Sequence, residues 1–151
     1  MKPFKKILVA HDFSEHAAAA LETAVDLSRR YEASLTILYV QEPISYATPE
    51  AFPVYPWNQI TVLLEAGEKQ LEKAKQQALE LGATAVEARL AQGSPSFEIT
   101  KHAKSGGYDL IVMGTHGRTG IARALMGSVA ERVVRTAPCS VATVRLPVEA
   151  A

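Results

Sequence analysis

Short apolar runs alternate along the chain with segments of helical periodicity, and this alternation is what most constrains the fold. Continuous apolar or β-branched runs, typical of strands covered on both faces, occupy residues 5–10, 34–40, 84–90, 109–113 and 140–144. Helical spacing occupies 14–31, 60–81, 95–105 and 128–136. Because each crossover helix must pack back on the sheet, this order predicts a doubly wound α/β fold with a parallel sheet.

Two of these helices carry a clear apolar face. In 14–31 the small or apolar residues predicted to face the core are Ala17, Ala18, Leu21, Ala24, Val25 and Ser28. In 128–136 they are Val129, Val133 and Val134. The helix at 95–105 begins with Ser94 as N-cap and Pro95 at its first position.

Residues 60–81 carry apolar or small residues in alternating steps of four and three. We interpret this stripe as a helix packed on the sheet, which Gly82 ends. The strict spacing also fits a weak coiled-coil seam, which is the alternative. The preceding segment, 41–57, holds four prolines and four aromatic residues and is predicted to be a long loop, acting as a lid or as an interface.

Length and charge restrict the class of protein. The chain has 151 residues with 16 Lys+Arg and 16 Asp+Glu, so residues 1–151 are expected to form a single domain without net charge. The absence of an overall basic excess argues against nucleic acid, and no apolar run is long enough to predict membrane insertion. Cys139 is the single cysteine, which excludes an internal disulfide. The first residues lack an apolar secretion signal, so a cytoplasmic location is expected.

A glycine-rich segment follows the fourth predicted strand, from Gly114 to Ser128. Glycines at a strand end can take positive φ angles and let backbone N–H groups approach an anion, and the helix that follows adds its positive dipole end. This favours phosphate binding. The alternative is a loop whose glycines only form turns, with Ser128 and Glu131 as a capping box. Neither a Walker P-loop nor a Rossmann fingerprint is present.

The same residues resemble a known family. The pattern Gly114-x2-Gly117-x9-Gly127-Ser128 matches the G-x2-G-x9-G-[ST] signature of the ATP-binding branch of the universal stress protein family. Further blocks of the chain, from about Ile7 to Val144, are similar to that family in the same order. The resemblance implies a five-stranded parallel sheet in the order 3-2-1-4-5 with helices on both faces. It also implies a homodimer paired through the final strand, 140–144.

The resemblance further implies an ATP site at the ends of the first, second and fourth strands, with Mg²⁺ or Mn²⁺ carried by the nucleotide. Asp12 would contact the nucleoside, although from the residues alone it is equally a helix cap. The backbone of Val40 would contact adenine. Met113 and Gly114 would line the ribose. Ala10 and His11 depart from the family pattern, in which many members have proline and then threonine or serine. This difference alters the adenine pocket. Ala10 is also expected to be one of the nucleotide contacts. The phosphates would be held by Gly117, Gly127, Ser128 and Val129.

The function expected from these features is a nucleotide-dependent binding or regulatory module in a stress response, with an unidentified protein partner. No residue stands out as a base that would activate water, so at most weak ATP hydrolysis is expected and no catalytic residue is assigned. A slow ATPase or phosphotransferase is the enzymatic alternative. A dimeric interaction protein that binds no nucleotide is the third. The four histidines lack the spacing of a structural metal site.

Overall fold

The computed structural model describes residues 3–43, 57–117 and 126–146. Five strands form one sheet with every neighbouring pair parallel, in the order β3-β2-β1-β4-β5. This is the predicted order, so the doubly wound fold is confirmed. The elements are β1 (Lys6–Ala10), α1 (Glu15–Tyr31), β2 (Ser34–Gln41), α2 (Trp57–Glu80), β3 (Val86–Gln92), α3 (Pro95–Ser105), β4 (Leu110–Gly114), α4 (Ser128–Thr136) and β5 (Ser140–Val144).

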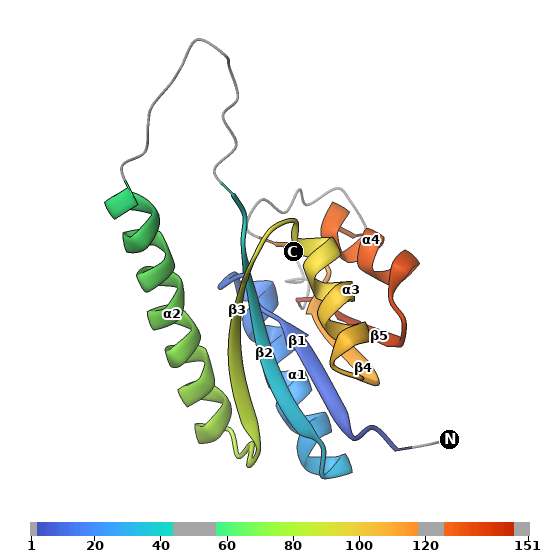
Figure 1. Ribbon diagram of the computed structural model, residues 1–151. Coiled ribbons are helices and arrows are strands. Elements are labelled where there is room, and N and C mark those ends of the chain that lie inside the picture. The colour runs from blue at the N-terminus through green and yellow to red at the C-terminus, as the bar shows by residue number, and fades with distance from the viewer. Residues whose placement is uncertain (1–2, 44–56, 118–125, 147–151) are drawn as a thin grey trace, which may run out of the picture.

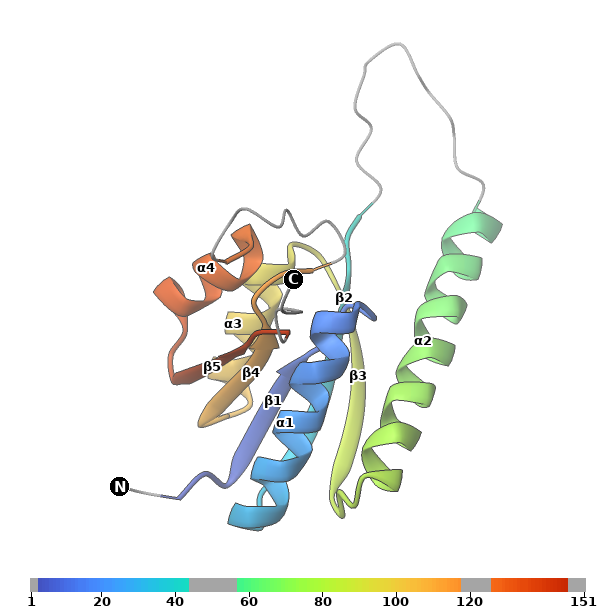
Figure 2. The same ribbon diagram turned by 180° about the vertical axis from the view of Figure 1, so that it is seen from behind.

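Two helices cover each face of the sheet, and each face has its own apolar core. Helices α3 and α4 lie in front of the sheet in Figure 1, while α1 lies behind it and comes to the front in Figure 2. Helices α1 and α2 bury one core, which includes Leu21, Val25 and Leu71. Helices α3 and α4 bury the other, with Ile99, Ala103 and Val133. The central strand β1 contributes to both cores, because its successive side chains point to opposite faces.

Two details of the predicted helix faces are wrong. In α1, Ala18 is exposed, and Ala20, which was not predicted to face the core, is buried. In α4 the buried residues are Ala130 and Val133, while Val134 is 46% exposed. A helix repeats every 3.6 residues, so the residue beside a correctly predicted one can fall just outside the buried stripe.

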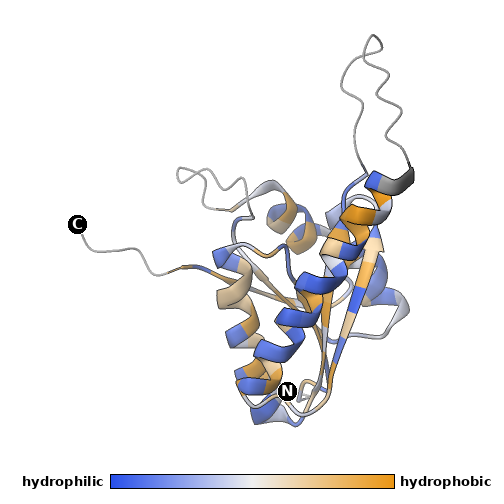
Figure 3. Ribbon diagram, turned by 90° about the vertical axis from the view of Figure 1, so that its left-hand side faces the viewer, coloured by the Kyte–Doolittle hydropathy of each residue, from blue (hydrophilic) through white to orange (hydrophobic). Residues whose placement is uncertain are grey.

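Helix α2 packs mainly on the sheet and also contacts α1. The middle of its stripe, Gly67, Leu71, Ala74 and Ala78, is buried, and the helix contacts β2 and β3. The coiled-coil alternative is therefore not what the stripe encodes. Figure 3 shows α2 from its outer side, where hydrophilic residues occupy much of its length. The predicted loop at 41–57 falls largely on residues 44–56, which lie outside the described residues.

Cys139 lies beside the second core, just before β5. Partial burial and, secondarily, the nearby Asp109 carboxylate raise the pKa of this thiol. Both effects disfavour the thiolate, which is the reactive form of cysteine.

Candidate functional site

A cavity of about 520 Å³ opens at the carboxyl ends of β1, β2 and β4, where α3 and α4 begin. Small-molecule sites in proteins span about 300–1,000 Å³. In a doubly wound sheet this is the place where the direction of winding reverses and where ligands bind. Every nucleotide contact predicted from the sequence lies on the wall of this one cavity: Ala10, Asp12, Val40, Met113, Gly114, Gly117, Gly127, Ser128 and Val129.

Asp12 is not the cap of the helix that follows it. The N-cap of α1 is Ser14, whose hydroxyl accepts a hydrogen bond from the Ala17 N–H at 3.1 Å. The Asp12 carboxylate instead accepts hydrogen bonds from the N–H and the hydroxyl of Ser14. The cap alternative is wrong, and the carboxylate lies on the cavity wall.

The glycines of the 114–128 segment that the structure describes serve close packing. None of Gly114, Gly117 and Gly127 has a positive φ, so that part of the prediction is wrong for these positions. A Cβ added to Gly114 would lie 2.7 Å from the His16 Cβ, and one added to Gly117 would lie 2.5 Å from the Asp12 Oδ2. At Gly127 it would lie 3.3 Å from the Thr115 carbonyl oxygen. Gly117 and Gly127 are thus close to other parts of the cavity wall, whereas Gly114 is close to the first turn of α1.

Helix α4 presents its N-terminus to the cavity. Its N-cap is Gly127 and its first residue is Ser128, so the predicted Ser128 and Glu131 capping box is not formed. The Glu131 carboxylate instead pairs with Arg135 at 2.7 Å. The Gly127 N–H donates to the Thr115 carbonyl at 2.6 Å, which ties the start of α4 to the residue after β4. The first N–H groups of a helix have no partner within it, and they favour an anion there.

The charged side chains among the described lining residues are Asp12 and Glu42, both acidic, and two histidines, His11 and His116, join them. Arg118 and Arg123, which the sequence offered as possible partners of phosphate, lie outside the described residues. Within the described wall, the favourable potential for an anion therefore comes from the N-terminus of α4. A divalent cation bound with a polyphosphate would offset the carboxylates.

Helix α3 forms a further wall through Pro95 and Ile99, which the sequence analysis missed. The signal was present, because Pro95 begins the predicted helix and Ile99 follows four residues later on the same helix face.

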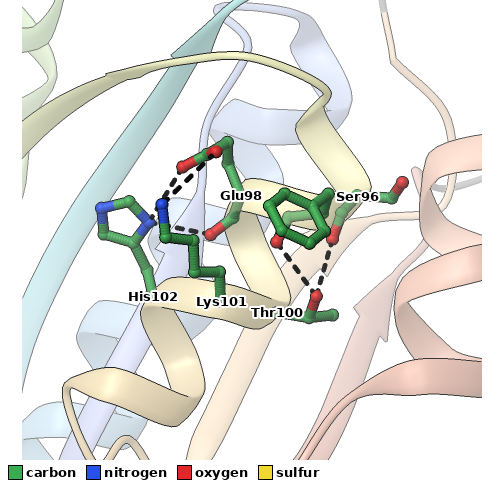
Figure 4. A network of polar contacts seen from close by, with 6 residues as sticks. Ser96, Glu98, Thr100, Lys101 and His102 are labelled. Atoms are coloured by element: carbon green, nitrogen blue, oxygen red, sulfur yellow. Dashed lines mark hydrogen bonds and ion pairs between the residues drawn. The ribbon is translucent and has the colours of Figure 1, made fainter.

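Polar contacts within α3 hold this wall in place (Figure 4). The Glu98 side chain is buried. Its Oε1 lies 3.9 Å from the Lys101 Nζ, and its Oε2 lies 3.7 Å from the His102 Nδ1. The His102 Nδ1 also lies 2.8 Å from the Glu98 carbonyl oxygen. The Thr100 hydroxyl donates to the carbonyl of Ser96 at 3.1 Å. These contacts join successive turns of α3, the helix from which Ile99 reaches the cavity.

Residues 3–43, 57–117 and 126–146 contain no group of three or more His, Cys, Asp or Glu side chains arranged to hold a metal ion. No helix in this part of the chain combines the length and apolar character needed to cross a membrane.

Comparison with known proteins places these features in a family. The model of the universal stress protein family matches residues 3–145. The chain is 38% identical to the universal stress protein YxiE of Bacillus subtilis, covering 94% of this chain and 99% of that one. It is 36% identical to a universal stress protein of Methanocaldococcus jannaschii, covering 95% and 84%.

Solved structures show the same fold. Universal stress protein UspA of Lactobacillus plantarum superposes with a TM-score of 0.82 at 32% identity, covering 96% of this chain and all of that one. A universal stress protein solved in complex with cAMP gives 0.71 at 25% identity, covering 95% and 98%. One from Archaeoglobus fulgidus in complex with dAMP gives 0.67 at 23%, covering 94% and 98%, a likeness of fold alone. The sheet order, the glycine segment at its switch point and these matches together show that the chain belongs to the universal stress protein family.

Proposed function

We propose that the cavity binds ATP together with Mg²⁺ or Mn²⁺, and that the protein is a nucleotide-dependent binding or regulatory module in a stress response. The observation that carries this is the convergence of the nine predicted contacts on one cavity wall. They come from three strand ends and one helix N-terminus that are far apart in sequence. Adenine nucleotides in two structural relatives, cAMP in one and dAMP in the other, support the adenine part of the proposal.

The proposed arrangement divides the cavity between the two ends of the nucleotide. Ala10 and the Val40 backbone would face adenine, and Asp12 would contact the nucleoside. Met113 and Gly114 would line the ribose. The phosphates would lie against Gly117, Gly127, Ser128 and Val129, at the N-terminus of α4.

The residues present fit this group. The cavity volume of about 520 Å³ suits a nucleotide, and no Cβ atom on the three glycines holds a ligand away from the backbone. The described carboxylates do not form a metal cage, so the phosphates and water would supply most ligands of the cation. The proposal includes at most weak hydrolysis, because no lining residue is assigned as a base. It also includes a cytoplasmic location.

The first experiment identifies any nucleotide released when the purified protein is denatured, by chromatography and mass spectrometry. The stripped protein is then titrated calorimetrically with MgATP, AMP and cAMP. We expect MgATP to bind, and Gly127→Val to weaken it at least about tenfold, because a branched side chain would block the phosphates beside the Thr115 carbonyl.

Val134→Thr, on the exposed side of α4, is the matched control and should bind as the wild type does. Thermal unfolding checks that both variants are folded. No released nucleotide and no heat of binding from folded wild-type protein would contradict the proposal. MgATP affinity unchanged in Gly127→Val would contradict the phosphate placement.

A further inference from the structure

The turn between β1 and α1 contains a strained residue. Phe13 has a φ of 66°, in the left-handed region that bulky side chains rarely adopt. Such a conformation persists only where its surroundings enforce it, and it is often found where a functional group must be held in place. Phe13 directly follows Asp12, the residue proposed above to contact the nucleoside.

The His11 side chain supplies one restraint on Phe13. The His11 Nδ1 accepts a hydrogen bond from the Phe13 N–H at 3.0 Å. A ring nitrogen can accept only when it carries no proton, so this bond requires the neutral imidazole with its proton on Nε2. His11 is itself well anchored, because it is 6% exposed and its backbone N–H donates to the Leu38 carbonyl at 2.9 Å.

Packing of the Phe13 ring supplies a second restraint. Its centroid lies 4.5 Å from that of Tyr39 and 5.2 Å from that of His11, both with tilted planes. Tyr39 is 8% exposed, and its hydroxyl donates to the Gln41 Oε1 at 2.9 Å. The left-handed residue is therefore held by its N–H on one side and by its ring on the other.

Asp12 lies between these two restrained residues in the chain, so their conformation sets where its side chain starts. Its carboxylate accepts hydrogen bonds from Ser14, just beyond Phe13. The Oδ2 lies so near Gly117 that an added Cβ there would be 2.5 Å away. A change in the backbone at Phe13 would turn the Asp12 carboxylate away from the cavity wall or into Gly117.

We infer that His11 is a positioning residue for nucleotide binding: its neutral imidazole holds Phe13 in the left-handed conformation, which aims Asp12 into the cavity. His11 acts through Asp12 and is not itself assigned a contact with the nucleotide. This inference rests on the proposed function, since it concerns how the nucleoside contact is set.

The test first removes the hydrogen-bond acceptor at residue 11 and then restores one. His11→Leu fills a similar volume without an acceptor, and we expect MgATP to bind about tenfold more weakly. His11→Asn restores one, because an Asn side chain can accept the N–H two residues on. We expect this variant to recover affinity to within about threefold of the wild type. A role in packing alone predicts the opposite order, because Asn is smaller and more polar than Leu.

A double-mutant cycle then asks whether His11 acts through Asp12. Asp12→Asn alone should weaken MgATP binding, and adding His11→Leu to it should change the affinity by less than about twofold. Full additivity of the two effects would overturn the inference. An affinity of His11→Leu for MgATP equal to that of the wild type would also overturn the inference, provided that the wild type binds MgATP. An absence of MgATP binding in the wild type itself would contradict the proposed nucleotide site, and the inference with it.

A measurement without ligand keeps the two failures apart. Nitrogen NMR of the wild type at neutral pH should find His11 neutral with its proton on Nε2. The Phe13 amide should exchange slowly in the wild type and in His11→Asn, and faster in His11→Leu. A charged His11 ring, or a proton on its Nδ1, would overturn the inference whatever the nucleotide titrations show. This NMR measurement uses the wild-type protein, so it does not depend on the folding of any variant.

Discussion

An added Cβ would be too close to a neighbouring residue at both Gly114 and Gly117, but the neighbouring residues differ. Gly114 faces the backbone of α1, where an added Cβ would lie 2.9 Å from the His16 carbonyl carbon as well as 2.7 Å from its Cβ. Among the described residues, Gly117 faces the end of the Asp12 side chain. Backbone atoms of a packed helix cannot move aside, whereas a carboxylate can rotate.

The two glycines should therefore respond differently to alanine. Gly114→Ala should lower the free energy of unfolding by about 1–3 kcal/mol, because it overpacks β4 against α1. Gly117→Ala should leave it within about 0.5 kcal/mol of the wild type, while displacing the Asp12 carboxylate and weakening MgATP binding. Urea unfolding and calorimetry measure the two quantities. Equal losses of stability in both variants would contradict this distinction.

For individual residues, the sequence predicted which ones line the cavity better than it predicted the contacts that explain their presence there. The spacing of Gly114, Gly117 and Gly127 marked three positions that lie on the cavity wall. Their roles depend on His16, Asp12 and Thr115, and two of these lie about a hundred residues away in the chain. Local pattern carries no information on such contacts, so positive φ was expected where close packing is found. The strained Phe13 has no sequence signal, because a bulky aromatic residue disfavours the conformation that it adopts here.

Among the elements, α2 shows how a helix can be fitted to its sheet through a single glycine. Gly67 faces the Tyr39 ring of β2, and an added Cβ would lie 2.9 Å from the Tyr39 Cε1 and 3.2 Å from the Leu90 Cδ1. Glycine disfavours a helix interior by about 1 kcal/mol relative to alanine. The close approach of α2 to Tyr39 accounts for its presence there.

Replacing this glycine sets helix propensity against packing. Gly67→Ala should gain about 1 kcal/mol of helix propensity and lose about 1–3 kcal/mol to overpacking, so a small net loss of stability is expected. Ala66→Gly, at the exposed neighbouring position, is the control, and it should cost about 1 kcal/mol through propensity alone. Urea unfolding measures both. A clear gain of stability in Gly67→Ala would contradict the expected overpacking and show that the Tyr39 ring moves aside at little cost.

The elements were largely predictable, and β3 shows where the prediction is limited. The sequence placed this strand at 84–90, whereas β3 runs from Val86 to Gln92. Its position is set by pairing with β2, in which Val86 lies opposite Leu35 and Gln92 opposite Gln41. A strand ends where its partner ends, and apolar residues alone do not reveal the partner. The central strands were easier, because burial on both faces gives an uninterrupted apolar run.

For the whole molecule, β5 is an edge strand of the sheet, paired on one side with β4. An unpaired strand edge presents free N–H and C=O groups, which a second copy of the chain can pair with. We propose that the protein forms a homodimer through β5, as the family resemblance implies.

A lysine on this edge should weaken such a dimer. Thr143 is exposed in β5, so Thr143→Lys should leave the monomer folded while opposing edge-to-edge pairing. Sedimentation velocity should show a dimer for the wild type and a shift of at least about tenfold in the dimer dissociation constant for the variant. Thr136→Lys, at the exposed end of α4, is the matched control and should remain dimeric. A wild-type protein that is monomeric at all concentrations would contradict the proposed dimer.

The position of β1 at the centre of the sheet affects how the chain is made. β1 pairs with β2 on one side and with β4 on the other, and Asp109, just before β4, accepts hydrogen bonds from the N–H groups of Lys5 and Lys6. Roughly 70 residues separate the end of β2 at Gln41 from the start of β4 at Leu110. At a synthesis rate of about 5–20 residues per second, a nascent chain leaves one edge of β1, with its backbone N–H and C=O groups, unpaired by β4 for several seconds. The central strand of the finished sheet is thus open to wrong pairing while the chain is being made on the ribosome.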